Sequence, residues 1–89
     1  MNKVNTLEQV LEILLSKMHV TSKTYLKNSK EEDLIQFHHT LGMHIRNKFR
    51  LWVVNIALTK DMGLEKDTHA DEVSQKIIEA LWKRLQKDK

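Results

Sequence analysis

The sequence predicts a compact, all-α bundle of about four helices that forms a single domain over residues 1–89, and three observations support this prediction. First, the chain has no Pro and only two Gly, so little interrupts a helix, and it has no Asn-Gly or Asp-Gly pair for a hairpin turn. Second, apolar residues recur at spacings of three and four. Third, 40% apolar and 30% charged residues suit one hydrophobic core rather than a disordered segment.

The first helix is expected to begin at Asn5 or Thr6 and to end near His19. Either residue can cap this helix, because Glu8 or Gln9 follows three residues later and completes a capping box. The apolar stripe of the helix consists of Leu7, Val10, Leu11, Leu14 and Met18.

The next segment, Val20–Asn28, is polar and β-branched, which predicts a linker. Within it we expect Tyr25 and Leu26 to lie against the core. Ser29 and Glu32 then form a second capping box, so the second helix is expected to begin directly after Ser29.

The second helix is expected to continue beyond residue 45, and a third helix that contains the apolar run Leu51–Leu58 follows it. That third helix is apolar almost all round, which predicts that it is the buried central helix, and Met62-Gly63 is a typical signal for its end. A sharp turn over residues 48–51 is expected to separate the two helices, with a kink as the alternative. The stripe of the second helix consists of Leu34, His38, Leu41, Ile45 and Phe49.

The fourth helix is expected to be capped by Asp67 or Thr68 and to carry Asp71 and Glu72 in its first turn. Its apolar face is wider than one neighbouring helix can cover, which indicates either self-association or a tightly wrapped monomer. This face consists of Val73, Ile77, Leu81 and Leu85, extended by Ile78 and Trp82.

The composition excludes several classes of protein. Without Cys, neither disulfides nor thiolate ligands can stabilise the fold. Residues 1–5 lack the apolar stretch of a signal peptide, and the apolar run over residues 51–58 is too short to span a bilayer, so we expect a cytoplasmic protein with no membrane contact. The net charge of +3 is too small to indicate a nucleic-acid partner by itself.

The segment from His38 to Trp52 resembles a signature of an uncharacterised bacterial and phage family of helical domains, H-x-x-L-G-x-W-I-R-N-x-x-G-L-W. The chain departs from it at His44, where the family has Trp, and at Arg50, where it has Gly. The resemblance implies a fold and the place of a site, but no activity. The matching positions are His38, Leu41, Gly42, Ile45, Arg46, Asn47, Leu51 and Trp52, and Asp71-Glu72-Val73-Ser74 is similar to a later acidic-Ser stretch of the family.

Three residues of this segment, His38, Gly42 and Arg46, are spaced by four and would form one ridge on a continuous helix, with Asn47 one residue round. A mid-helix Gly costs about 1 kcal/mol relative to Ala, so either a neighbouring helix or a ligand is expected to approach Gly42 closely. His38 is either a core histidine or a donor to a bound anion. The Arg46 guanidinium needs either an internal carboxylate or a ligand phosphate. Trp52 is expected in the core.

Charge and histidine spacing limit the chemistry of this region. The chain from Leu34 to Lys60 contains no carboxylate, although bases at helix ends also complement the helix dipole. His38, His39 and His44 lack the spacing of three or four that a helical two-His metal site needs. Because the chain also lacks Cys and a Ser in a Gly-rich elbow, we expect a non-enzymatic protein without metal or cofactor.

Two functional hypotheses follow. The first is a binding module for a small anionic ligand, such as a nucleotide or a nucleotide-derived signal, and phage members of the resembling family imply a sequestering protein as one form of it. The second is a protein-interaction module, an adaptor or inhibitor that docks through the basic motif face or through the fourth helix. Nucleic-acid binding is disfavoured because no recognition helix is visible. The candidate ligand-binding residues are His38, Gly42, His44, Arg46, Asn47 and Arg50.

Overall fold

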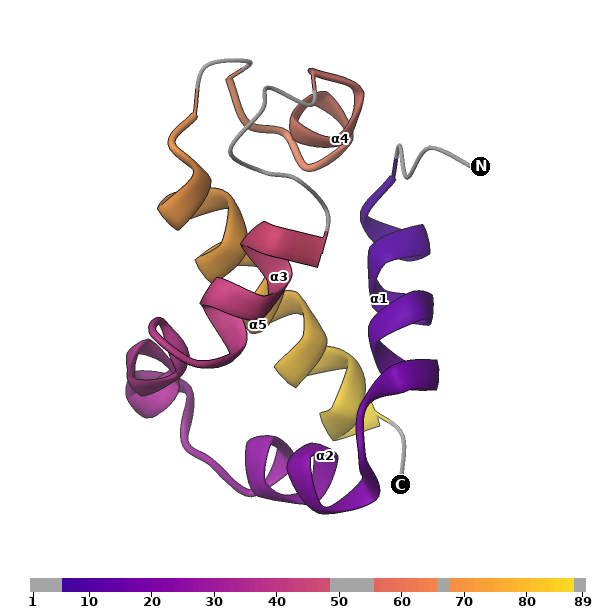
Figure 1. Ribbon diagram of the computed structural model, residues 1–89, viewed down its shortest axis with the longest axis vertical. Coiled ribbons are helices and arrows are strands. Elements are labelled where there is room, and N and C mark those ends of the chain that lie inside the picture. The colour runs from indigo at the N-terminus through magenta and orange to yellow at the C-terminus, as the bar shows by residue number, and fades with distance from the viewer. Residues whose placement is uncertain (1–5, 49–55, 66–67, 88–89) are drawn as a thin grey trace.

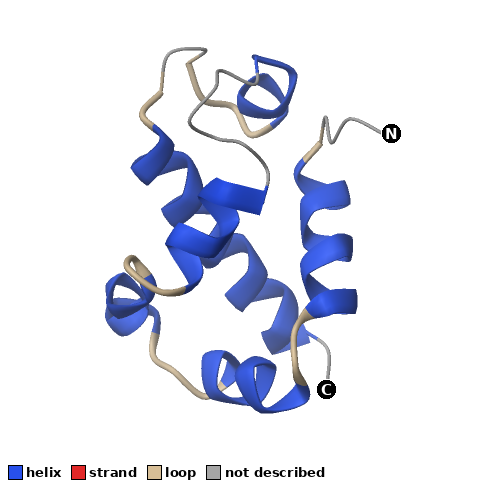
Figure 2. Cartoon of the chain, viewed as in Figure 1, coloured by secondary structure: helices blue, strands red, loops and turns tan. Residues whose placement is uncertain are grey.

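The computed structural model is an all-α globule, which confirms the predicted fold class, and it describes residues 6–48, 56–65 and 68–87 (Figures 1 and 2). Within these ranges there is no strand and there are more, shorter helices than the four expected. The elements are α1 (Leu7–Lys17), α2 (Val20–Lys27), the 3-10 helix η1 (Glu31–Phe37), α3 (Leu41–Lys48), α4 (Ile56–Asp61) and α5 (Ala70–Lys87).

The last helix, α5, is the centre of the described fold. It has 18 residues and packs against α1, α2, η1 and α3, which surround it (Figure 1). Most of the segment that is expected to form the central helix, residues 51–55, lies outside the described residues, and Leu58 of α4 is fully buried. The expected stripe of α5 is confirmed, since Val73, Ile77, Leu81 and Leu85 are all buried.

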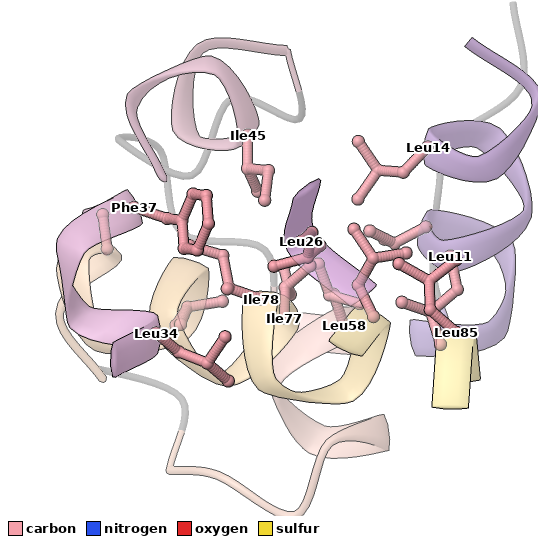
Figure 3. Packing of buried hydrophobic residues seen from close by; sticks show 14 residues of the cluster. Leu11, Leu14, Leu26, Leu34, Phe37, Ile45, Leu58, Ile77, Ile78 and Leu85 are labelled. Carbon is pink, nitrogen blue, oxygen red and sulfur yellow. The ribbon is translucent and has the colours of Figure 1, made fainter. Parts of the chain in front are cut away.

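The hydrophobic core forms where the other helices meet α5 (Figure 3). Leu14 and Leu26 enter it from α1 and α2, while Ile45 enters it from α3. Each fully buried aliphatic side chain contributes about 1.5–3 kcal/mol through removal from water, so the core and not helix propensity stabilises these short helices.

The start of α1 agrees with its capping box. The Gln9 amide donates to Thr6 Oγ1 at 3.2 Å, and the Thr6 amide donates to Gln9 Oε1 at 3.2 Å. The alternative cap, Asn5, lies outside the described residues. α1 ends at Lys17, close to the expected end near His19.

The prediction of a linker over Val20–Asn28 is wrong, because most of this segment forms α2. His19 caps the helix by accepting the Thr21 amide on Nδ1 at 3.2 Å. Leu26 is 1% exposed, as expected, and Tyr25, although 60% exposed, packs its ring edge-on against the buried Phe37 with 5.6 Å between the ring centroids. The helical cap and the burial of Leu26 against α5 outweigh the low helix propensity of the segment.

The second predicted helix is also corrected, because its expected cap is not used. Ser29 Oγ donates to the Tyr25 carbonyl oxygen at 2.9 Å, which ties Ser29 to the end of α2 instead. The chain then forms η1, in which Leu34 and Phe37 lie three residues apart and are both buried. The Thr40 amide bonds back to the Phe37 carbonyl oxygen at 3.3 Å, and this turn separates η1 from α3. The expected single helix is thus two short ones.

The end of α4 follows the predicted Gly signal. Gly63 has a φ of 76°, a left-handed conformation that Gly adopts without strain. The Gly63 amide bonds to the Lys60 carbonyl oxygen at 3.0 Å and the Leu64 amide to that of Thr59 at 2.8 Å, the pair of bonds that defines a Schellman motif. The predicted turn over residues 48–51, and Phe49, Leu51 and Trp52 with it, lie largely or wholly outside the described residues.

The start of α5 differs from the expected cap. Thr68 Oγ1 donates to the Glu65 carbonyl oxygen at 2.6 Å, while His69 Nδ1 accepts the Asp71 amide at 3.1 Å and takes the capping role. Asp67 is not among the described residues. No helix in the described ranges combines the length and the apolar character needed to cross a membrane.

The wide apolar face of α5 is covered within one chain. Ile78 is fully buried, and Trp82 is half-buried with its indole Nε1 donating to the Ser29 carbonyl oxygen at 2.8 Å. Next to it, Gln86 Nε2 donates to the Lys27 carbonyl oxygen at 2.7 Å. Packing within one chain therefore accounts for the width of this face.

Candidate functional site

The predicted site residues fall on three different parts of the described fold. His38 follows η1 as its C-terminal cap residue, whereas Gly42 and Arg46 lie on the inner side of α3 and are buried. Because a turn separates His38 from α3, the predicted ridge along one continuous helix is corrected. His44 and Asn47 lie on the exposed side of α3, and Arg50 is outside the described residues.

The guanidinium of Arg46 links α3 to α5 and to the turn after η1. Nη1 donates to Ser74 Oγ at 2.9 Å, Nη2 donates to the His38 carbonyl oxygen at 3.3 Å, and Nε lies 3.5 Å from Asp71 Oδ1. The Arg46 side chain is only 3% exposed. Of the two alternatives for Arg46, the geometry supports the internal ion pair, since the whole guanidinium fork faces groups of the same chain.

The carboxylate of Asp71 is the outer end of this network and is 45% exposed. Oδ2 lies 3.8 Å from His38 Nε2, a contact that becomes an ion pair only when the imidazole is protonated. Oδ2 also lies 3.8 Å from His69 Nδ1, but that nitrogen already accepts the Asp71 amide hydrogen. We therefore regard His69 as a helix cap and not as a partner of the carboxylate.

Gly42 makes room for this network. A Cβ atom at position 42 would lie 3.0 Å from Arg46 Nη1 and 3.6 Å from Ser74 Oγ. Of the two alternatives for Gly42, the geometry favours close approach of a neighbouring helix, because α5 supplies Ser74 to this contact. The space that a ligand would need beside Gly42 is filled by the Arg46 side chain.

The hydroxyl of Ser74 has no free hydrogen-bonding role for catalysis. Its Oγ accepts from Arg46 and donates to the Asp71 carbonyl oxygen at 3.0 Å, and the residue is fully buried. In the described ranges, no group of three His, Cys, Asp or Glu side chains is placed to hold a metal ion.

The sequence reasoning missed Asp71 and Ser74 as partners of Arg46. The family resemblance contains a signal for these partners, because the acidic-Ser stretch over residues 71–74 belongs to it together with the segment that holds Arg46. What the sequence lacked was the register between α3 and α5, which the buried side chains of both helices determine. The two resembling segments are therefore brought into direct contact.

A groove with a different character lies between α1 and α5 and encloses about 390 Å³. Leu7, Leu11 and Ala80 provide its apolar lining, and Lys83 and Lys87 stand on its α5 side. Two further groups at the groove are engaged in holding its walls together: Arg84 is ion-paired with Glu8, and Asp61 Oδ2 accepts the Leu7 amide at 2.7 Å.

The lysines of this groove differ from its other charged residues. In the part of the chain that the structure describes, neither Lys83 nor Lys87 is within ion-pair distance of a carboxylate, although both line the groove. The groove therefore combines an apolar floor with two cations that have no described counter-ion.

Comparison with known proteins gives a family but no activity. Residues 5–85 match the model of a family described as a domain of unknown function, DUF6794. This match runs from before α1 into the last turn of α5. No curated protein and no solved structure matches the chain.

Proposed function

The chain belongs to the DUF6794 family. We propose that it is a non-enzymatic protein-interaction module that docks a partner protein in the groove between α1 and α5. The observation that carries the proposal is the contrast between two sets of cations. Arg46 is buried among groups of its own chain, whereas Lys83 and Lys87 line an open groove.

The internal role of Arg46 argues against a phosphate site at the signature segment. A ligand phosphate there would have to displace Asp71 and Ser74 from the guanidinium, leaving a buried network without its partners. Breaking such a network destabilises the fold, because each buried polar group left without a hydrogen-bond partner costs about 1–3 kcal/mol of free energy. The signature residues therefore act as structural supports in this proposal.

The groove offers the features of a helical docking site. Its apolar floor would be removed from water by a partner side chain, and its lysines would provide charge selectivity at the rim. The Glu8–Arg84 ion pair joins the two walls, and the bond from the Leu7 amide to Asp61 ties the start of α1 to the end of α4 beside the groove. A preformed groove reduces the entropy lost on binding.

Site-specific photo-crosslinking in cells that express the protein tests this proposal. A photoreactive residue is placed at Lys83, and the matched control carries it at Lys76, an exposed residue of the same helix that does not line the groove. We expect a discrete protein adduct from position 83 that is absent from position 76. No protein adduct from position 83, or equal adducts from both positions, would overturn the proposal.

The hypothesis that the chain binds a small anionic ligand stays a prediction. The resemblance of residues 38–52 to the signature of a bacterial and phage family also stays a prediction. Its candidate residues are split between a buried network and the exposed face of α3 that carries His44 and Asn47. Native mass spectrometry of freshly purified protein would detect a co-purifying nucleotide. A nucleotide that is lost in Arg46→Lys but kept in Lys83→Glu would favour the sequestering role and count against docking in the groove.

A further inference from the structure

The described surface carries a second charged cluster, opposite in sign to the groove. Glu31, Glu32 and Asp33 form the first turn of η1 and are all exposed. Among the described residues, no lysine, arginine or histidine lies within ion-pair distance of them. The first turn of a helix favours acidic residues, which explains their presence there, but it does not neutralise them.

Each of the two clusters has an apolar neighbour. Ile35 follows the acidic turn directly and is 64% exposed. The lysines stand beside the groove floor of Leu7 and Ala80. The acidic turn with Ile35 is therefore complementary to the groove in both charge and polarity.

The two surfaces lie on different sides of α5 and are held apart within one chain. Trp82 and Gln86 face the segment that leads from α2 into η1, because they bond to the carbonyl oxygens of Ser29 and Lys27. Arg84, by contrast, faces α1 through its ion pair with Glu8. These bonds hold α5 in place, with the acidic turn on one side of it and the groove on the other.

We infer that the groove between α1 and α5 binds the acidic turn of η1, with Ile35, from a second copy of this chain. This inference rests on the proposed function and names its partner. Lys83 and Lys87 are one helical turn apart, about 6 Å along the axis, so two neighbouring carboxylates can reach them together. Because the two surfaces differ, the contact is made either twice, across the two-fold axis of a dimer, or head-to-tail through a ring or a chain.

A nucleic acid fits the same groove less well. Phosphates would pair with Lys83 and Lys87 but would leave the floor of Leu7 and Ala80 without an apolar partner. Ile35 of a second copy would cover that floor. The net charge of +3 adds little long-range attraction for a polyanion.

Sedimentation velocity across a wide range of protein concentration tests the inference with three variants. The first, Lys83→Glu/Lys87→Glu, reverses the charge of the two groove lysines. The second, Glu31→Lys/Glu32→Lys, reverses the charge of two residues of the acidic turn. The third, Lys17→Glu/Lys48→Glu, is a matched control that alters the net charge as much as the first but leaves the groove intact. Circular dichroism of each variant checks that the helices are retained.

We expect the parent and the control to self-associate at low salt, and each reversed variant alone to associate roughly tenfold or more weakly, since surface ion pairs become repulsive. A mixture of the two reversed variants should associate again, because the swapped charges match. A parent that stays monomeric at every concentration, a groove variant that associates like the parent, or a mixture without recovery would overturn the inference. A monomeric parent that still crosslinks another protein from position 83 would overturn the inference while leaving the proposed function in place.

Discussion

Replacing Arg46 by Lys tests the internal network, because it keeps the charge and removes the planar fork. The guanidinium contacts Ser74, the His38 carbonyl oxygen and Asp71 together, whereas one ammonium group cannot reach all three. The loss of about one charge-assisted hydrogen bond should lower the free energy of unfolding by ~1.5–3 kcal/mol. Asp71 is 45% exposed, so water compensates for its weakened ion pair and adds little to this figure.

Thermal unfolding followed by circular dichroism measures the effect. For a domain of this size the expected loss corresponds to a melting temperature that is roughly 6–24 °C lower. Arg84→Lys is the matched control: it makes the same chemical change in a partly exposed pair with Glu8, and we expect about 0–1 kcal/mol. If Arg46→Lys destabilises the protein no more than Arg84→Lys does, the internal role assigned to Arg46 is refuted.

Three further substitutions test neighbouring parts of the account by the same melts. Gly42→Ala should destabilise the parent by about 1 kcal/mol, because the new Cβ would press on Arg46 Nη1. In an Arg46→Met background the same substitution should stabilise the protein by about 1 kcal/mol, because Ala has the higher helix propensity. Equal effects in both backgrounds would contradict this explanation. Trp82→Phe should cost about 1 kcal/mol by removing the bond to the Ser29 carbonyl oxygen, and an unchanged melt would mean that this bond does not hold α2 to α5. Thr6→Ala should cost about 1 kcal/mol through the lost capping box, and no effect would place the start of α1 elsewhere.

The sequence was sufficient for the fold class and for the most periodic helix. The apolar spacing of α5 is regular over 18 residues, so the predicted buried face is the observed one. The Gly63 signal and the Thr6 capping box were also readable, because both depend on residues within one turn of each other. Sequence patterns therefore predict the structure correctly where interactions between residues close in the chain determine it.

The sequence was insufficient where two local patterns compete. Ser29 could cap a following helix or close the preceding one, and its bond to the Tyr25 carbonyl oxygen selects the second. α2 lacks a strong apolar stripe and depends on the burial of Leu26 against α5. These outcomes depend on tertiary packing, which spacing along the chain does not encode.

The sequence indicates the segment that holds Arg46 but does not decide between an internal and a ligand-binding role for it. Arg46 was correctly identified as a residue in need of a partner, with an internal carboxylate as one alternative. The partners lie 25 and 28 residues away, at Asp71 and Ser74, and only the packing of α3 on α5 reveals them. The groove was missed because its two walls, α1 and α5, lie at opposite ends of the chain.

A double-mutant cycle between Arg46 and Ser74 tests most directly whether the signature segment is a structural support joining α3 to α5. Urea unfolding of the parent, Arg46→Met, Ser74→Ala and the double variant gives the coupling energy, in which the separate bond from Ser74 to the Asp71 carbonyl oxygen cancels. We predict a favourable coupling of about 1.5–3 kcal/mol, the value of one buried charge-assisted hydrogen bond. Additive effects, with a coupling within about 0.5 kcal/mol of zero, would contradict the account.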